Sequence, residues 1–376
     1  MEAEAPTYEG DAQKTGTSAS TPVNGNTTRV GEGRKDSVDL YYELHGRGPH
    51  KVLLVMGFAT SCKAWMPNVK ELVAEHGDEF EVCIFDNRGC GRSSCPDSKF
   101  STSIMASDAL DLLDHLKWDK VHLVGISMGG MISQELSLLL LPQERLASLV
   151  LAVTHAGGLY ATAPMAGVLG MMTSIFKKTA DEKADILMKL IYSPKFLTEP
   201  CKYDSSKTWE EYCKQTYIER VRSEPQMTPK ALAGHIRCVT THHVSSKRLR
   251  LLREAQVPIV IVTGTIDALV RPKNSYLLAQ ELNPVEFHVW EGAGHAVNME
   301  CLDRFNEVII RNFRRAVEGS GQRSPAEEEA ADSLGSPSSA SKPEQEVATE
   351  TTEQQQEDDR PKEEDREAAV AAEVAL

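Results

Sequence analysis

The sequence predicts an α/β fold in which a mainly parallel sheet is flanked by helices. Short apolar runs rich in β-branched residues alternate with helical patterns from about residue 30 to residue 313, an order typical of βαβ architecture. Two of these runs, beginning at Lys51 and Pro258, are apolar at successive positions. Strands of that kind are covered by helices on both faces, as they are in a parallel sheet.

The predicted strands and helices follow one another along the chain. We expect strands at residues 40–44, 52–55, 82–85, 121–124, 149–153, 259–263 and 287–290. We expect helices at residues 64–75, 104–116, 128–140, 273–282 and 298–316. In the second helix, Ala109, Leu112 and Leu113 fall on one stripe and the aspartates lie elsewhere, as a helix packed on a sheet requires.

The composition divides the chain into five segments. Residues 1–28 show no apolar periodicity and residues 317–376 contain no aromatic residue; such segments cannot bury enough apolar surface to offset the entropy of ordering, so we expect disorder in both. Residues 154–256 have helical character and no convincing parallel strand. They are interpreted as a helical cap inserted between two core segments, 29–153 and 257–316.

The acidity of the chain is concentrated in its last segment. Residues 317–376 hold 17 acidic and five basic residues, which is a net charge of −12. The rest of the chain therefore carries only −2 of the total net charge of −14. A nearly neutral folded part gives no electrostatic reason to expect nucleic acid as a partner. The acidic tail is interpreted as a solubilising extension, and its protein partners, if it has any, stay unknown.

Targeting and redox signals favour a cytoplasmic protein. The early acids Glu2 and Glu4 disfavour a secretory signal or a transit peptide, and no stretch reaches the ~18 apolar residues of a transmembrane helix. The eight cysteines have no C-x-x-C spacing, which reduced thiols explain more simply than disulfides or a zinc site.

The strongest motif is Gly125-x-Ser127-x-Gly129, which follows a predicted strand and precedes a predicted helix. A strand-to-helix turn of this kind strains the central residue, and only small residues two before and two after it avoid a clash. Ser127 would then project above the sheet at a helix N-terminus, where a developing anion is favoured. We predict that Ser127 is a nucleophile; the alternative is an inert serine in a tight turn.

A serine nucleophile needs a base, and the base needs a partner that fixes its tautomer. Asp267 follows the strand predicted at 259–263, and His295 follows the one at 287–290. Both would lie at the carboxyl edge of the sheet, where α/β folds gather their chemistry, and in the order nucleophile, acid, histidine. We therefore predict a triad of Ser127, Asp267 and His295.

The tetrahedral intermediate of acyl transfer needs two hydrogen-bond donors for its oxyanion. One is expected to be the backbone N–H of Met128, which directly follows the nucleophile. The other is expected from the loop after the strand at 52–55, where Gly57 allows a tight turn and Phe58 is the candidate.

These residues together resemble the α/β-hydrolase superfamily, in particular its enol-lactonase-like, cofactor-free haloperoxidase-like and epoxide-hydrolase-like branch. The resemblance covers residues 30–316 and includes Phe85-Asp-Asn-Arg-Gly-Cys-Gly-Arg-Ser-Ser, which is similar to the family's D-x-R-G-x-G-x-S loop. It implies that Asp86, Arg88 and Ser93 are scaffold residues. The chain departs from many relatives at Met56, where they carry His, and at Ile126, where they carry His or Tyr.

The motifs and the resemblance predict a serine hydrolase that cleaves an ester, thioester or lactone bond of a small or lipid-like acyl substrate. No metal ion and no organic cofactor is needed for this chemistry. A serine nucleophile in place of aspartate argues against epoxide hydrolysis and dehalogenation. Met165, Leu169 and Met172, in an apolar stretch of the cap, are candidates for lining an acyl pocket, although that stretch also fits the cap's own packing face.

Two other functions stay open at this point. Some receptors of this superfamily keep the fold and the triad but act as ligand sensors with slow or no turnover. A scaffold protein with a vestigial site is the third possibility, and the complete triad argues against it.

Overall fold

The computed structural model describes residues 25–34, 36–158 and 161–319. The predictions made for residues 1–24 and 320–376 lie outside this part of the chain. Within it, no helix is both long and apolar enough to cross a bilayer. All eight cysteines are free.

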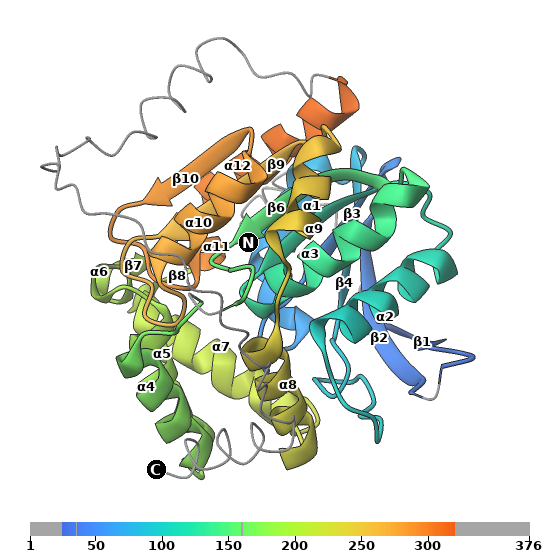
Figure 1. Cartoon of the computed structure of the whole chain (residues 1–376). Coiled ribbons are helices and arrows are strands. Elements are labelled where there is room, and N and C mark those ends of the chain that lie inside the picture. The colour runs from blue at the N-terminus through green and yellow to red at the C-terminus, as the bar shows by residue number, and fades with distance from the viewer. Residues whose placement is uncertain (1–24, 35, 159–160, 320–376) are drawn as a thin grey trace, which may run out of the picture. The chain divides into compact units, whose positions relative to one another are not determined.

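An eight-stranded sheet runs through the centre of the fold, in the order β1-β2-β4-β3-β5-β6-β9-β10 (Figure 1). The strands are β1 (Asn26–Val30), β2 (Val38–Gly46), β3 (His50–Val55), β4 (Phe80–Phe85), β5 (Val121–Ile126), β6 (Leu146–Ala152), β9 (Ile259–Gly264) and β10 (Glu286–Trp290). From β4 to β10 all neighbours pair in parallel, whereas β2 pairs antiparallel with both β1 and β4. The mainly parallel sheet and all seven predicted strands are confirmed.

Helices cover both faces of the sheet, which explains why its strands are apolar at successive positions. Along β3, Leu53 and Val55 pack into one core cluster, whereas Val52 and Leu54 pack into another. The first cluster is covered by α2 (Thr102–His115), α3 (Met128–Leu140), α9 (Ser246–Glu254) and α10 (Pro272–Leu282), and the second by α1 (Met66–His76), α11 (Val297–Glu300) and α12 (Leu302–Val317). The 3-10 turns η1 (Cys62–Trp65) and η2 (Leu141–Gln143) complete this part.

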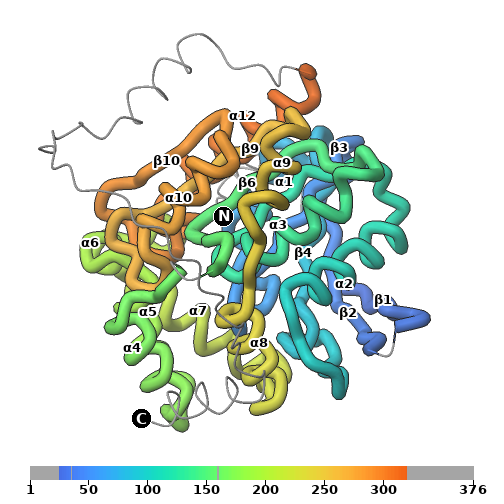
Figure 2. Tube along the Cα trace, in the orientation of Figure 1, coloured from blue at the N-terminus to red at the C-terminus, as the bar shows by residue number. Residues whose placement is uncertain are grey.

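The segment between β6 and β9 is mostly helical, as predicted. It contains α4 (Met165–Phe176), α5 (Ala180–Ile191), α6 (Pro194–Thr198), α7 (Trp209–Ser223) and α8 (Pro229–Thr241), with a small hairpin of β7 (Pro200–Cys201) and β8 (Asp204–Thr208). Helix α5 packs between α4 and α7, and the tube in Figure 2 shows how the chain passes through these helices and returns to the sheet at α9. Met188, Phe196 and Trp209 form a third, separate apolar cluster.

Three features of this architecture differ from the sequence prediction. Strand β1 begins at Asn26, inside the segment 1–28 that was expected to be disordered; only Thr28 and Val30 of this edge strand are buried, too few to give an apolar pattern. The hairpin β7-β8 was not predicted because its residues are mostly polar. Helix α9, placed in the cap segment 154–256, buries Leu249 and Leu252 in the core cluster beside α3 and α10.

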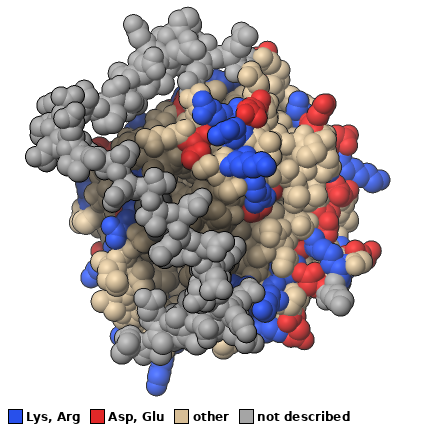
Figure 3. Space-filling model, in the orientation of Figure 1, with Lys and Arg blue, Asp and Glu red and all other residues tan. Residues whose placement is uncertain are grey.

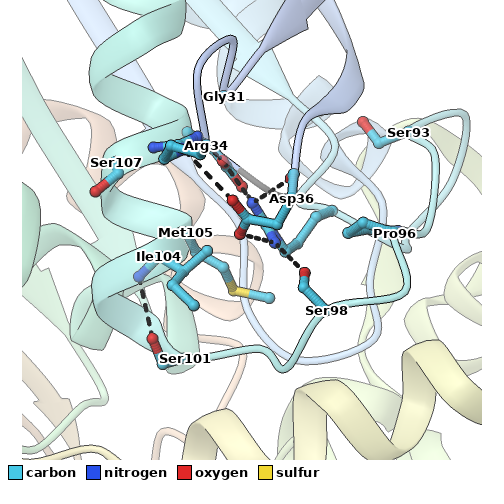
Figure 4. A network of polar contacts seen from close by, with 12 residues as sticks. Gly31, Arg34, Asp36, Ser93, Pro96, Ser98, Ser101, Ile104, Met105 and Ser107 are labelled. Atoms are coloured by element: carbon cyan, nitrogen blue, oxygen red, sulfur yellow. Dashed lines mark hydrogen bonds and ion pairs between the residues drawn. The ribbon is translucent and has the colours of Figure 1, made fainter.

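A buried ion-pair network fastens the loop that follows β4. Arg88 is completely buried, and its guanidinium donates to both carboxylate oxygens of Asp108 at 2.6 and 2.7 Å and to Asp36 at 3.0 Å. Figure 4 shows Arg34, Asp36 and Ser98 gathered around this network. Ser93 Oγ in turn donates to the Asp86 carbonyl at 2.6 Å. The resemblance implied a scaffold role for this loop, and these contacts support it.

Candidate active site

Ser127 occupies the sharp turn that its motif predicts. Strand β5 ends at Ile126, Ser127 has φ 56° and ψ −124°, and α3 begins at Met128. The turn is held from both sides, since Ser127 N donates to the Ala152 carbonyl at 2.9 Å and the Ser127 carbonyl accepts from Gly130 N at 2.9 Å. Such a conformation costs a non-glycine residue free energy and is retained where the surroundings enforce it.

The glycines flanking Ser127 are required by close contact with backbone. A Cβ added to Gly125 would lie 2.5 Å from the Gly129 carbonyl oxygen, and one added to Gly129 would lie 2.1 Å from the Val55 carbonyl oxygen. The second contact is with the end of β3, which cannot move without disturbing the sheet. Helix α3 therefore starts in contact with β3, directly beside the loop that follows that strand.

We expect Gly129→Ala to lower the free energy of unfolding by roughly 1–3 kcal/mol, because the new methyl group overpacks a site closed by backbone. Gly170→Ala in α4 is the matched control, since its Cβ would meet only the Leu190 side chain, at 3.1 Å. Alanine also has the better helix propensity, so the control is expected to be neutral or slightly stabilised. Urea unfolding of both variants tests the difference, and equal stabilities would contradict it.

Asp267 and His295 are brought together by two neighbouring parallel strands. His295 Nδ1 lies 2.8 Å from Asp267 Oδ2, and both residues are buried. The other carboxylate oxygen, Oδ1, accepts from Leu269 N at 2.8 Å and Val270 N at 2.9 Å. An ionised carboxylate held in this way can only accept, so Nδ1 of the imidazole carries the hydrogen and Nε2 is left as an acceptor.

The two loops that carry this pair are also joined through their backbones. Thr265 N donates to the Trp290 carbonyl and Ile266 N to the Ala293 carbonyl, each at 3.1 Å. These bonds extend the pairing of β9 with β10 beyond the strand ends. The distance between the carboxylate and the imidazole is therefore set by the sheet.

Glu300 supports the histidine loop and was missed by the sequence analysis. Its Oε1 accepts from Gly294 N at 2.9 Å and from Ser193 N, in the cap, at 3.0 Å. Burial raises the pKa of this carboxyl, and the hydrogen bonds to both amides act in the opposite direction. No motif marks Glu300, because one of its two partners is more than 100 residues away in the chain.

The loop predicted to supply an oxyanion donor lies against the nucleophile. A Cβ added to Gly57 would be 3.1 Å from Ser127 Cβ and 3.6 Å from Ser127 Oγ. Phe58 follows directly, and the Met56 carbonyl accepts from Asn87 Nδ2 at 2.9 Å. Met128 is the first residue of α3, so its N–H has no acceptor within that helix. The structure thus places Met128 directly after Ser127 and Phe58 in the wall of the same cavity. The role of their N–H groups as oxyanion donors stays a prediction.

A cavity of about 420 Å³ opens between this site and the cap. Its size is in the range of small-molecule sites. Ser127, His295 and Phe58 line it from the core, and the cap contributes mainly apolar and aromatic side chains, among them Met171, Ile175, Leu187, Met188, Tyr192, Tyr212 and Tyr217. Among the described residues, the Ser127 hydroxyl makes no hydrogen bond to the imidazole, although both groups line the same cavity. Catalytic hydrogen bonds are often long in unliganded enzymes and shorten when substrate binds.

The three cap residues predicted to contact substrate do not line this cavity. Met165 and Leu169 are 76% and 65% exposed, and Met172 shares their stripe of α4. The stripe that faces the cavity carries Met171, Ser174 and Ile175 instead. The prediction was wrong because an α4 that is apolar nearly all round gives no periodicity from which the inward face could be read.

Comparison with known proteins gives matches over most of the described chain. Residues 51–301 match the alpha/beta hydrolase fold family. A protein of Azorhizobium caulinodans named "Putative carbamate hydrolase RutD" is 26% identical over 72% of this chain and 94% of its own length. Serine hydrolase BPHL of Mus musculus is 24% identical over 78% of this chain and 85% of its own.

A 2-hydroxy-6-oxononadienedioate/2-hydroxy-6-oxononatrienedioate hydrolase of Paraburkholderia phymatum is 23% identical over 72% of this chain and 89% of its own length. Among solved structures, a thermophilic esterase from Thermogutta terrifontis superimposes with a TM-score of 0.60 at 23% identity, over 78% of this chain and 99% of that chain. At this identity the structural likeness establishes the fold alone.

Proposed function

The chain belongs to the alpha/beta hydrolase fold family, and on that basis we propose that it is a serine hydrolase acting on an ester, thioester or lactone bond of a small acyl substrate. One observation carries the proposal. His295, which contacts Asp267 at 2.8 Å, lines the same cavity as Ser127, which is held at φ 56° on a strand-to-helix turn. The hydrolase names of the relatives support the reaction class.

In the proposed mechanism, Ser127 Oγ attacks the carbonyl carbon while its proton passes to His295 Nε2. Asp267 holds Nδ1–H and stabilises the imidazolium that forms. The oxyanion accepts hydrogen bonds from the Phe58 and Met128 amides. The imidazolium then protonates the leaving alkoxide or thiolate, and an acyl-serine remains. Water attacks this acyl group, gives its proton to Nε2, and the acid leaves as Ser127 recovers its hydrogen.

Labelling with a fluorophosphonate probe tests the nucleophile directly. We expect one adduct, located by peptide mass spectrometry on the peptide that contains Ser127, together with turnover of p-nitrophenyl esters of increasing acyl length. An adduct on another serine, or none at all, would refute the assignment. Specific labelling of Ser127 without turnover of any ester would favour the ligand-sensing alternative.

The charged groups of the cavity support a substrate that carries an anion. Two of the charged groups that line the cavity already have partners within the protein. Lys63 forms an ion pair with Glu43 at 2.5 Å. Glu224 accepts a hydrogen bond from Ser61 Oγ at 3.0 Å and lies 3.7 Å from the Arg92 guanidinium. Arg220 also lines the cavity, beside the ring of Tyr217. Within the described part of the chain Arg220 forms no ion pair, although its charge acts to lower the pKa of Glu224, which lines the same cavity. A cation in a largely apolar cavity is stabilised by an opposite charge, and one relative is named for a dicarboxylate substrate.

We expect Arg220→Met to reduce kcat/KM for a p-nitrophenyl ester of a dicarboxylic acid by about 10- to 100-fold, the contribution of a charge-assisted hydrogen bond. Hydrolysis of the p-nitrophenyl ester of a neutral acid of equal length is expected to change little. Arg222→Met, two residues along α7 and 71% exposed at its side chain, is the control. Equal losses for the charged and the neutral ester would refute the anion preference.

A further inference from the structure

The loop that carries Phe58 is held by a histidine of the cap. Ala59, the next residue, has a positive φ of 48°. Its amide donates to Nδ1 of His235, in α8, at 3.2 Å. Alanine in this left-handed conformation is less stable than in its usual ones, so a neighbouring group has to hold it there.

Only one protonation state of His235 satisfies both of its contacts. The Ala59 amide can only donate, so Nδ1 must accept. Nε2 lies 3.0 Å from the carbonyl oxygen of Arg88, which can only accept, so Nε2 must carry the hydrogen. His235 is completely buried, and burial lowers its pKa, which favours this neutral form.

The other end of the bridge is rigid. Arg88 is fixed by its buried ion pairs with Asp108 and Asp36. The His235 ring also contacts the rings of Phe58 and Phe100, with centroid distances of 6.0 and 6.1 Å. The imidazole therefore connects an immobile part of the scaffold to the loop after β3.

Phe58 lies between two fixed points of this loop. On its N-terminal side, the Met56 carbonyl is held by Asn87. On its C-terminal side, the Ala59 amide is held by His235. A single peptide group lies between these points, and it carries the Phe58 N–H. Because both of its neighbours are held, we expect this group to have little freedom to rotate.

We propose that His235 is a positioning residue that keeps the Phe58 amide oriented toward the oxyanion, so that the cap completes the reaction site as well as covering it. The inference rests on the proposed function. Helix α8, which carries His235, packs tightly against the loop that follows β4. A Cβ added to Gly89 in that loop would lie 2.8 Å from Ala231 Cβ of α8, and a Cβ added to Gly234 of α8 would lie 2.5 Å from the Phe100 ring. Without the Ala59 contact, the Phe58–Ala59 peptide group keeps the hydrogen bond from Thr60 Oγ1 to the Phe58 carbonyl at 2.9 Å. We expect that bond alone not to hold the strained conformation, so that the Phe58 N–H turns away.

Two substitutions separate the two bonds of the imidazole. In His235→Asn the amide oxygen takes the place of Nδ1 and accepts from Ala59, but the side chain does not reach Arg88. In His235→Gln the amide nitrogen takes the place of Nε2 and donates to Arg88, but the bond to Ala59 is lost. A purely structural role predicts similar effects of the two changes, because each removes one buried hydrogen bond.

The positioning role predicts different effects. We expect His235→Asn to keep kcat for a p-nitrophenyl ester within about threefold of wild type. We expect His235→Gln to lose about 10²-fold in kcat with little change in KM, as when one oxyanion donor is removed. Hydrogen exchange of the Ala59 amide is a second readout, expected to stay slow in the Asn variant and to become fast in the Gln variant.

Each variant alone can overturn the inference. A folded His235→Asn protein that loses 10²-fold in kcat, or a folded His235→Gln protein that retains wild-type kcat, contradicts it. Thermal midpoints establish that the compared proteins are folded. Failure of the proposed function has a different signature, because the wild type would then show no ester turnover, with or without labelling of Ser127.

Discussion

Ser127→Ala is expected to lower kcat for ester hydrolysis by about 10⁵- to 10⁶-fold, because in the proposed mechanism Ser127 forms the acyl intermediate. The hydrogen-bond donors and the cavity remain, so the residual rate is expected to stay above that of the uncatalysed reaction. Ser127 makes its hydrogen bonds to Ala152 and Gly130 through its backbone. The variant is therefore expected to unfold at nearly the wild-type temperature.

Steady-state hydrolysis of p-nitrophenyl butyrate, together with fluorophosphonate labelling, tests this expectation. Ser103→Ala is a suitable control, since Ser103 lies exposed on α2 and does not line the cavity. A Ser127→Ala protein that retains a tenth of the wild-type rate would exclude Ser127 as nucleophile.

Asp267→Asn is expected to lower kcat by about 10⁴-fold, through the tautomer of His295. Oδ1 of Asp267 accepts two backbone amides, from Leu269 and Val270. The carbonyl oxygen of an asparagine has to take that position, so its NH₂ group faces the imidazole. Nδ1 must then accept, and Nε2 carries the hydrogen and can no longer take the proton of Ser127.

Three measurements check this argument. The double variant Ser127→Ala, Asp267→Asn is expected to be no slower than Ser127→Ala alone, because the triad acts as a unit. Asp185→Asn, whose side chain is 58% exposed on α5, is the control and is expected to leave kcat unchanged. A ¹⁵N NMR spectrum of His295 that shows the same tautomer in wild type and Asp267→Asn would contradict the mechanism.

Much of the fold was readable from the sequence because its signals are local. The inner strands β3 and β9 are buried on both faces, so each contains an unbroken apolar run, at residues 52–55 and 259–262. The turn at Ser127 was readable for a similar reason, since Gly125 and Gly129 are needed by atoms only a few residues away or by the adjacent strand end. Asp267 and His295 could be proposed as the other members of the candidate triad because each follows a predicted strand and both come after Ser127 in the expected order.

Other features could not be read because their partners are distant in the chain. Strand β1 has two buried residues and is recognised only by its pairing with β2. Glu300 and His235 carry no motif, and each acts on backbone amides or carbonyls contributed by other segments. The inward face of α4 depends on how that helix is rotated against its neighbours, which its apolar composition leaves open.

By itself the sequence determined the α/β fold class and pointed to the three residues that we propose for acyl transfer, since both follow from residue types and short-range spacing. Only the tertiary structure decided which cap side chains face the reaction site and which groups hold its loops in place. Those properties depend on contacts between segments far apart in the chain, and such contacts are set by the packing of the whole fold and leave no local pattern.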